Sequence, residues 1–331
     1  HVFFGLDMTA IPPTPEPPAG ATADDAASVR LVSRRSALLG GLGVAALAGI
    51  SACSTTETTK PAAAEQELGD KGQADDVLPT ETQDSRPVPG PPIITGSFAS
   101  AKMLGRPTRW AVARPNGVTG KLPVVVVLHA LNTNERTIFN RKLQMQNVLQ
   151  AYVEDGNPPF ALAAVDGTTN YWHRRLNGAD AGAMVLDEFL PMLAGNPELN
   201  LSTERIGFYG WSMGGFGALR LAALVGAPRV AAVSVSSPAL WADPHAYPPR
   251  AFDSFEDYQG NSLFGQQNAF AKIPLMITIG SSDQFFTYTR QWAANLHPPA
   301  AFGSGAGGHS NRYWRSVMPD HVMFLGRNLA R

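Results

Sequence analysis

The stretch Phe208-Tyr-Gly-Trp-Ser-Met-Gly-Gly-Phe-Gly-Ala-Leu219 decides the fold of this 331-residue chain. It holds the pattern Gly-x-Ser-x-Gly centred on Ser212, between an apolar strand expected over 204–210 and an Ala/Leu-rich helix expected over 213–225. The glycines let the chain turn sharply without Cβ clashes. The serine hydroxyl then projects above the sheet at the positive end of a helix. The stretch therefore predicts a nucleophile elbow with Ser212 as the nucleophile.

A serine nucleophile needs an imidazole as general base and a carboxylate that orients the imidazole. In folds with this type of turn the chain order is serine, acid, histidine. Among the aspartates after the serine, only Asp283 directly follows a buried-looking strand, 273–280. His309 lies in a Gly-rich loop before the final helix, whereas His297 and His321 are expected to fill surface or packing roles. We therefore predict Asp283 and His309 as the acid and the base.

The charge that develops on a substrate oxygen needs an oxyanion hole, whose donors each contribute roughly 3 kcal/mol. One donor is expected to be the backbone N–H of Met213, directly after the nucleophile. The other is expected from the loop after the third strand, which is predicted over 122–129. That loop reads Ala130-Leu-Asn-Thr133.

The alternation of apolar strands with amphipathic helices predicts an α/β fold, a doubly wound and mostly parallel sheet with helices on both faces. About 240 residues, 92–331, suit one large catalytic domain. A Pro- and aromatic-rich excursion over 238–262 is expected to form a short cap over the active site. The expected strands cover 92–98, 107–113, 122–129, 160–165, 204–210, 230–237, 273–280 and 299–303. The expected helices cover 135–151, 181–194, 213–225, 285–296 and 311–329.

Four short stretches make residues 92–331 resemble the putative-esterase branch of the α/β-hydrolases. This branch includes esterase D (S-formylglutathione hydrolase), feruloyl and acetylxylan esterases, and the mycobacterial antigen 85 mycolyltransferases. The stretches are Leu-His-Ala-Leu at 128–131, Gly-Trp-Ser-Met-Gly-Gly at 210–215, Gly-Ser-Ser-Asp-Gln-Phe at 280–285 and Gly-Gly-His-Ser-Asn-Arg-Tyr-Trp at 307–314.

The resemblance implies the catalytic triad Ser212, Asp283 and His309. Similarity to antigen 85 implies the Leu131 amide as the second oxyanion donor. The sequence departs from the branch at one point, where most of its esterases read His-Gly after the third strand and this chain reads His129-Ala130. An alanine restricts φ at that position. His129 has no second histidine at metal-ligand spacing, and its match to the branch assigns it a structural role.

Four further side chains are candidates for substrate binding. Trp172 and Arg174 follow the strand expected over 160–165, on the side of the sheet that carries the site, and could form a platform for a sugar or an acyl group. Trp211 lies beside the nucleophile and Trp241 lies in the expected cap. The alternative is a packing role, with Trp172 in the core and Trp211 beneath the elbow.

The overall charge narrows the range of partners. The sequence has 26 Lys and Arg against 27 Asp and Glu, with a net charge of −1. No Lys/Arg run marks the region of the expected catalytic domain, so nucleic acid is not an expected partner. The motifs imply neither a cofactor nor a metal.

Residues 1–53 predict a disordered N-terminus followed by a signal for export. Arg34-Arg35 forms a twin-arginine pattern, and the apolar run over 37–50 has the length of a signal h-region. The run leads to Cys53, the single cysteine of the chain, in a context that resembles a bacterial lipobox. Acylation of Cys53 would anchor the protein to a membrane; the alternative is an incidental cysteine in a cleavable signal. Residues 54–91 are rich in Thr, Pro, Ala and acidic residues and predict a disordered tether.

Together these features predict an exported serine esterase that is lipid-anchored at the cell envelope or secreted. An acyltransferase similar to antigen 85 is the nearest alternative, because hydrolysis and transfer share an acyl-enzyme and differ only in the acceptor. A non-catalytic envelope-binding protein on the same fold is a second alternative. The export signal disfavours cytosolic thioester hydrolysis of the S-formylglutathione type.

Overall fold

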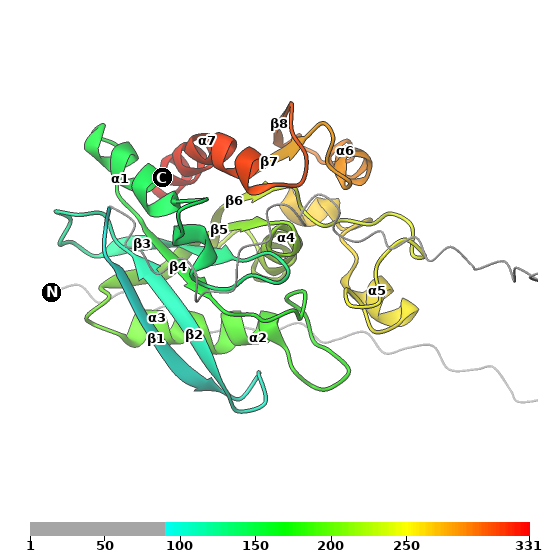
Figure 1. Ribbon diagram of the computed structural model, residues 1–331, viewed down its shortest axis with the longest axis horizontal. Coiled ribbons are helices and arrows are strands. Elements are labelled where there is room, and N and C mark those ends of the chain that lie inside the picture. Colours follow the sequence, from blue (N-terminus) through cyan, green and yellow to red (C-terminus); the bar gives the residue numbers. More distant parts are fainter. Residues whose placement is uncertain (1–89) are drawn as a thin grey trace, which may run out of the picture. The chain divides into compact units, whose positions relative to one another are not determined.

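The computed structural model describes residues 90–331, so the signal predicted for 1–53 and nearly all of the tether predicted for 54–91 lie outside the described residues. The described chain forms one eight-stranded sheet in the order β1-β2-β4-β3-β5-β6-β7-β8 (Figure 1). The strands are β1 (Ile93–Ser100), β2 (Arg106–Ala113), β3 (Leu122–Leu128), β4 (Ala161–Val165), β5 (Leu201–Trp211), β6 (Val230–Ser236), β7 (Leu275–Gly280) and β8 (Ala301–Gly305).

The sheet is antiparallel only at one end. β1 pairs with β2, and β2 with β4, in antiparallel register, whereas every other neighbouring pair is parallel. Although β8 at the edge of the sheet is mostly exposed, the central parallel strands are covered on both faces, so their sequences are largely apolar. The run of valines in β3 shows this, because Val124 and Val126 face one core while Val125 and Val127 face the other.

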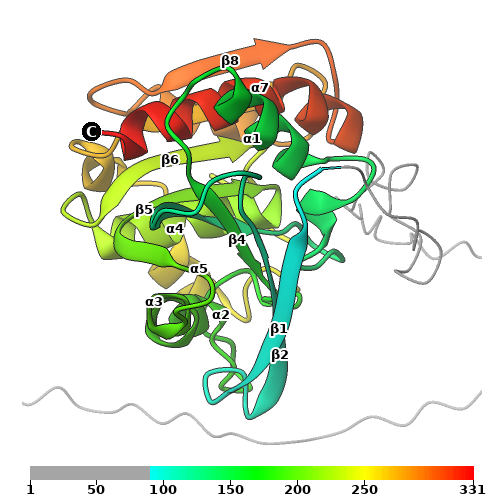
Figure 2. The same ribbon diagram turned by 90° about the vertical axis from the view of Figure 1, so that its left-hand side faces the viewer.

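Helices cover both faces of the sheet (Figure 2). On one face lie α1 and α7, which pack on each other, with α7 against β5 and β6. On the other face, α4 packs across β3, β5 and β6, and α3 packs against β5. The α-helices are α1 (Met145–Glu154), α2 (Ala181–Met184), α3 (Leu190–Gly195), α4 (Met213–Val225), α5 (Phe255–Asn261), α6 (Phe286–Ala293) and α7 (Asn311–Leu329).

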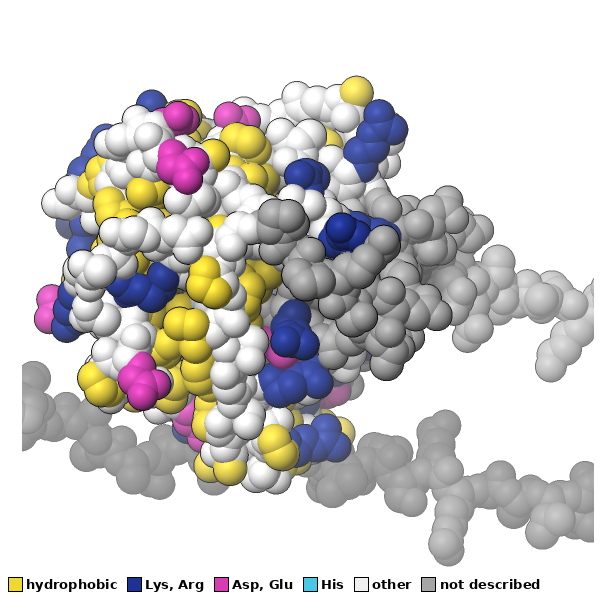
Figure 3. Space-filling view, turned by 60° about the vertical axis from the view of Figure 1, so that its left-hand side comes forward, with side chains coloured by type: hydrophobic (Ala, Val, Ile, Leu, Met, Phe, Trp, Pro, Cys, Tyr) yellow, Lys and Arg dark blue, Asp and Glu magenta, His cyan; other side chains and the backbone are white. Residues whose placement is uncertain are grey.

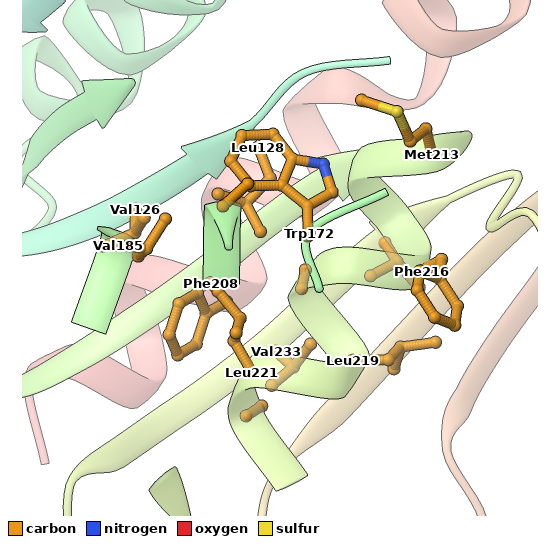
Figure 4. Close-up of a cluster of buried hydrophobic side chains, with 14 of the residues drawn as sticks. Val126, Leu128, Trp172, Val185, Phe208, Met213, Phe216, Leu219, Leu221 and Val233 are labelled. Carbon is orange, nitrogen blue, oxygen red and sulfur yellow. The ribbon is translucent and has the colours of Figure 1, made fainter. Parts of the chain in front are cut away.

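The larger core lies between the sheet and α4. Figure 4 shows part of it, in which Phe208 of β5 and Leu128 of β3 belong to the same cluster as Phe216 and Leu219 of α4. Trp172 lies in the same cluster and is fully buried. This core fixes the start of α4 against the ends of β3 and β5, which are the elements expected to carry the nucleophile and the oxyanion loop.

One expected helix is much shorter than the sequence suggests. The helix expected over 135–151 is a 3₁₀ turn at Thr137–Phe139 followed by α1. The side chain of Asn140 accepts hydrogen bonds from the backbone N–H groups of Lys142 and Leu143, at 2.8 and 3.1 Å. Asparagine competes with helical hydrogen bonds in this way. Gln144 then takes a left-handed conformation with φ 51°, so the helix begins only at the next residue.

Two other segments differ from the expectation in detail. The helix expected over 181–194 is interrupted by a π-helical turn at Val185–Phe189, between α2 and α3. The excursion between β6 and β7 contains the short helix α5, which was not among the helices expected from the sequence. Ser254 caps α5 by accepting a hydrogen bond from the backbone N–H of Asp257 at 3.1 Å. This excursion forms the expected cap.

The surface is mixed in charge on the face drawn in Figure 3, where acidic and basic side chains are interspersed. Within residues 90–331, none of the helices has the length and apolar character needed to cross a membrane.

Candidate active site

The turn from β5 into α4 holds Ser212 with φ 54° and ψ −122°, a backbone conformation that L-residues rarely adopt. The glycines on either side allow the elements to approach closely. A Cβ at Gly210 would lie 2.1 Å from the carbonyl oxygen of Gly214, and a Cβ at Gly214 would lie 1.8 Å from that of Leu128. The Ser212 N–H donates to the Ser236 carbonyl at 3.1 Å, which ties the turn to β6.

The structure brings Ser212, Asp283 and His309 into one hydrogen-bonded chain. His309 Nδ1 lies 2.9 Å from Asp283 Oδ2, and His309 Nε2 lies 2.8 Å from Ser212 Oγ. Because a carboxylate only accepts, Nδ1 carries the proton, and Nε2 is left to accept from the serine hydroxyl. All three residues are buried, with 4–5% of their surface exposed. This arrangement can withdraw a proton from Ser212.

Backbone contacts fix the carboxylate. Asp283 Oδ1 accepts from the Phe285 N–H at 2.9 Å, which leaves Oδ2 for the imidazole. The loops that carry the acid and the base also touch, because a Cβ at Gly280 would lie only 2.3 Å from the carbonyl oxygen of Gly307. A side chain at position 280 would push the two loops apart and stretch the contact between Asp283 and His309.

Two aromatic side chains hold the imidazole edge-on. The ring centroid of His309 lies 5.3 Å from the ring centroid of Phe285 and 5.0 Å from that of Trp314. Trp314 is itself fixed, because its indole N–H donates to Ser237 Oγ at 3.0 Å. Tyr313 and Trp314 were part of a predicted motif, but no contact with His309 was predicted for Phe285 or Trp314. The available signal for Phe285 was a bulky residue two positions after the acid.

The two amides expected in the oxyanion hole are unengaged. Neither the Met213 N–H nor the Leu131 N–H donates to any residue of the described segment 90–331. Ala130, which stands where the resembling esterases carry glycine, is fully buried and does not have a positive φ. Alanine is therefore accommodated without strain, and the departure from the His-Gly pattern does not distort the loop.

Two of the four candidate substrate-binding side chains are packed in the cores. Trp172 is fully buried on Gly217, where a Cβ would lie 2.4 Å from the indole (Figure 4). Trp211 is 1% exposed, with its ring 6.3 Å from Tyr209 and 6.4 Å from Trp314. These indoles offer no surface to a substrate, so the packing alternative describes both tryptophans.

The other two candidates lie closer to the surface. Trp241 of the cap has its ring 5.4 Å from Phe285, which in turn contacts His309, so the cap adjoins the hydrogen-bonded chain. Arg174 is exposed in a loop whose neighbour Arg175 binds Asp253 of the cap, at 2.7 and 3.0 Å. The structure gives Arg174 no contact with the triad side chains.

A buried polar cluster that joins β6, β7 and α7 was not predicted from the sequence. His321 of α7, expected only to pack, lies within 2.5–2.8 Å of the hydroxyls of Ser234, Ser236 and Thr278. Burial lowers the pKa of His321 to about 3, so the ring is neutral and exchanges hydrogen bonds with hydroxyl groups that can donate or accept. Serines at alternate positions of a buried strand were the available signal.

His129 has the structural role that was expected of it. Its Nε2 accepts from the Gly167 N–H at 3.0 Å, and its Nδ1 faces the Ala130 carbonyl oxygen at 2.8 Å. Among the residues that the structure describes, no three potential metal-ligating side chains cluster.

Comparisons with known proteins identify the family and the fold of the chain. The family model described as Putative esterase matches residues 100–325. None of the curated proteins compared matches the sequence. Among solved structures, a ferulic acid esterase is 18% identical with a TM-score of 0.62, covering 72% of this chain and 99% of its own.

Two further structures are similar in fold. The S-formylglutathione hydrolase of Agrobacterium tumefaciens is 15% identical with a TM-score of 0.59, covering 74% of this chain and 98% of its own. The fluorophosphonate-binding serine hydrolase F of Staphylococcus aureus is 19% identical with a TM-score of 0.57, covering 71% and 98%. At these identities the likeness establishes the fold, whereas the family match covers more than half of the sequence. The chain belongs to the Putative esterase family and has the α/β-hydrolase fold.

Proposed function

We propose that this protein hydrolyses a carboxylic ester through an acyl-enzyme formed on Ser212. The observation that carries the proposal is the chain of two hydrogen bonds, 2.9 and 2.8 Å long, that joins Asp283 to His309 and His309 to Ser212. A base within hydrogen-bond reach of a hydroxyl, itself oriented by a third group, is the general arrangement of an activated nucleophile.

The first half-reaction forms the acyl-enzyme. Ser212 Oγ attacks the ester carbonyl carbon while His309 Nε2 takes its proton, and Asp283 stays ionised and stabilises the imidazolium. The oxyanion of the tetrahedral intermediate accepts hydrogen bonds from the N–H groups of Met213 and Leu131. When the intermediate collapses, the bond to the leaving oxygen breaks and His309 gives that oxygen the proton.

The second half-reaction repeats these steps with water. His309 Nε2 takes a proton from the water as its oxygen attacks the acyl carbon, and the same proton returns to Ser212 Oγ when the acid leaves. An alcohol in place of water would give acyl transfer. Membership of an esterase family favours water as the acceptor. The non-catalytic alternative has no support from the three intact and connected side chains.

The proposed place of action is the cell envelope. Its support is the sequence of residues 1–91, where a twin-arginine pattern, an apolar run and the lone Cys53 precede a polar tether. Residues 1–89 of this stretch lie outside the described segment. An envelope ester, on a glycolipid or a polysaccharide, is the substrate class that an anchored enzyme would meet.

The test of the proposed chemistry is Ser212→Ala, with p-nitrophenyl acetate as substrate. Loss of the hydroxyl should lower kcat by several orders of magnitude and abolish labelling by a fluorophosphonate probe, since the nucleophile alone is removed. Asp283→Asn should also lower kcat, and should add little to Ser212→Ala because the groups act as a unit. Ser202→Ala, at the opposite end of β5, is the matched control and should keep wild-type kcat. Probe labelling or turnover that persists in Ser212→Ala would refute the assignment.

A further inference from the structure

Three donors converge on a single carbonyl oxygen in the loop after β3. The oxygen of Ala130 accepts from Thr133 Oγ at 2.8 Å and from the Thr133 N–H at 3.3 Å, and it faces His129 Nδ1 at 2.8 Å. Ala130 itself is fully buried. A carbonyl oxygen that accepts from two side chains as well as from a turn N–H is held more firmly than one that accepts from the turn N–H alone.

The Nδ1 atom of His129 can act only as a donor toward the Ala130 oxygen. The Gly167 N–H donates to His129 Nε2 at 3.0 Å, so Nε2 of the neutral ring carries no proton. In a neutral imidazole the proton then resides on Nδ1, which donates to the Ala130 oxygen. Asp166 Oδ1 also lies 3.5 Å from Nε2, and a ring charged beside that carboxylate would still carry a proton on Nδ1. Gly167 follows β4, so the neighbouring parallel strand selects the tautomer that holds the loop.

The turn that presents Thr133 is also set by the sequence. Residues 130–133 form a four-residue turn closed by the Thr133 N–H, and Asn132 at its third position has φ 59°. Asparagine tolerates this left-handed conformation better than most side chains do. The residues that follow are anchored too, because Glu135 Oε1 lies 3.3 Å from Arg109 Nε on β2. This turn therefore places the Thr133 side chain next to the Ala130 carbonyl oxygen.

Holding this carbonyl determines the direction of the neighbouring amide. The oxygen of Ala130 and the N–H of Leu131 belong to the same peptide group, and in a trans peptide they point in opposite directions. The side chains of Thr133 and His129 draw the oxygen toward the loop, so the N–H points away from it. The Leu131 N–H donates to none of the residues in the described segment.

We propose that Thr133, together with His129, is a positioning residue that aims the Leu131 N–H at the oxyanion of the tetrahedral intermediate. This inference rests on the proposed function, because it presupposes attack by Ser212. Without the Thr133 hydroxyl the peptide group can rotate, and the amide is then displaced from the place where negative charge develops. A preorganised donor stabilises the transition state more than the bound ester, so the effect should fall on kcat and not on KM.

The test compares Thr133→Val, which is nearly isosteric and lacks the hydroxyl, with Thr133→Ser, which restores it. Thr133→Val should lower kcat by about 10- to 100-fold, less than the roughly 10²- to 10³-fold loss for a deleted oxyanion donor, with KM unchanged. An arylboronic acid, whose tetrahedral adduct with Ser212 places an oxygen in the oxyanion hole, should lose affinity by the same factor. Thr133→Ser should restore both values.

A matched control is available in α6. Thr289 is fully buried, and its hydroxyl has no hydrogen-bond partner within the described segment. Thr289→Val removes a threonine hydroxyl far from the oxyanion loop in sequence and should change neither kcat nor the boronic acid affinity.

Two results would overturn the positioning role. One is a Thr133→Val enzyme with wild-type kcat and boronic acid affinity, and the other is an equal loss in Thr133→Ser. If Ser212→Ala is inactive in the same series, either result refutes the role of Thr133 alone. If Ser212→Ala keeps turnover, the proposed function itself fails.

Discussion

At the scale of single residues, the site depends on a serine in an unfavourable conformation. Ser212 has φ 54° and ψ −122°, and such backbone strain costs on the order of 1–3 kcal/mol. Hydrogen bonds from neighbouring segments hold it there, since the Ser212 N–H donates to Ser236 and its carbonyl accepts from the Ala239 N–H at 3.0 Å. The hydroxyl is therefore already directed at His309 before a substrate arrives.

This strain predicts an unusual ranking of two inactive variants. Ser212→Gly should be more stable than Ser212→Ala by about 1 kcal/mol, because only glycine adopts a positive φ without a Cβ penalty. Urea unfolding of the two proteins measures the difference. The same pair at Ser202, in the extended strand β5, should rank the other way. Equal stability of the two variants at position 212 would show that the strain is absent.

At the scale of elements, the strands were the predictable part of the fold. Every expected strand overlaps an observed one, because continuous or alternating apolar runs leave little choice in a doubly covered sheet. Helix limits were less predictable where a polar side chain competes with the backbone. Asn140 interrupts the helix expected over 135–151 through two side-chain hydrogen bonds, which only the folded loop reveals.

The triad residues of the site were as predictable as the strands, whereas the role of Trp172 was not. A turn motif and two strand ends were enough to select the side chains that meet at Ser212, because chain order and strand position constrain them. Trp172 was less tractable, since an aromatic side chain after a strand suits a pocket wall and a core equally well. The buried position of Trp172 is decided by Gly217, 45 residues away in the chain, because the missing Cβ leaves space for the indole.

The polar cluster around His321 links three elements, β6, β7 and α7, and it predicts how stability depends on pH. The pKa of this histidine is lowered from 6.5 to about 3 by burial. The unfolded chain therefore takes up a proton near pH 6.5, whereas the folded protein does so only near pH 3. Unfolding is favoured as the pH falls through this window, and the stability is fully present above about 6.5.

The expected loss between pH 7 and 3 from this group is on the order of 4–5 kcal/mol. Urea unfolding of the wild type and of His321→Asn at several pH values measures it, and the difference in slope between the two proteins isolates the histidine. Because carboxylates also titrate over this range, the wild-type slope alone is not diagnostic. Identical slopes in both proteins would mean that the folded state protonates His321 as readily as the unfolded chain does.

At the scale of the whole molecule, the sheet brings together residues that lie far apart in the sequence. The loops after β3, β5, β7 and β8 carry Leu131, Ser212, Asp283 and His309. In the parallel part of the sheet these loops all leave the same edge. Ser212 and His309 are 97 residues apart in the chain and 2.8 Å apart in space. The site therefore exists only in the complete fold, which suits the proposed twin-arginine export of an already folded domain.

The proposed anchor can be tested on the full chain. Wild-type protein should partition with membranes and carry a lipid mass on the peptide that contains Cys53, because two or three acyl chains hold a protein at a bilayer and a single chain does not. Cys53→Ala should shift to the soluble fraction or the medium. With about 38 residues of tether, the root-mean-square span of roughly 5–6 Å × √n gives the site a reach of about 30–40 Å. Equal release of both forms into the medium would show that the segment is a simple secretion signal.

The position of the base downstream of the nucleophile, after β8, has a consequence for biosynthesis. His309 comes from the loop after the last strand, and Trp314, in the first turn of α7, holds its ring. On the mechanism proposed, a nascent chain that already displays Ser212 has no group to deprotonate it. The hydrogen-bonded chain of Asp283, His309 and Ser212 is complete only after α7 has left the ribosome and packed against β6. Each molecule would therefore stay inert through translation and become reactive in one step, so that no truncated product released early could cleave esters inside the cell that makes it.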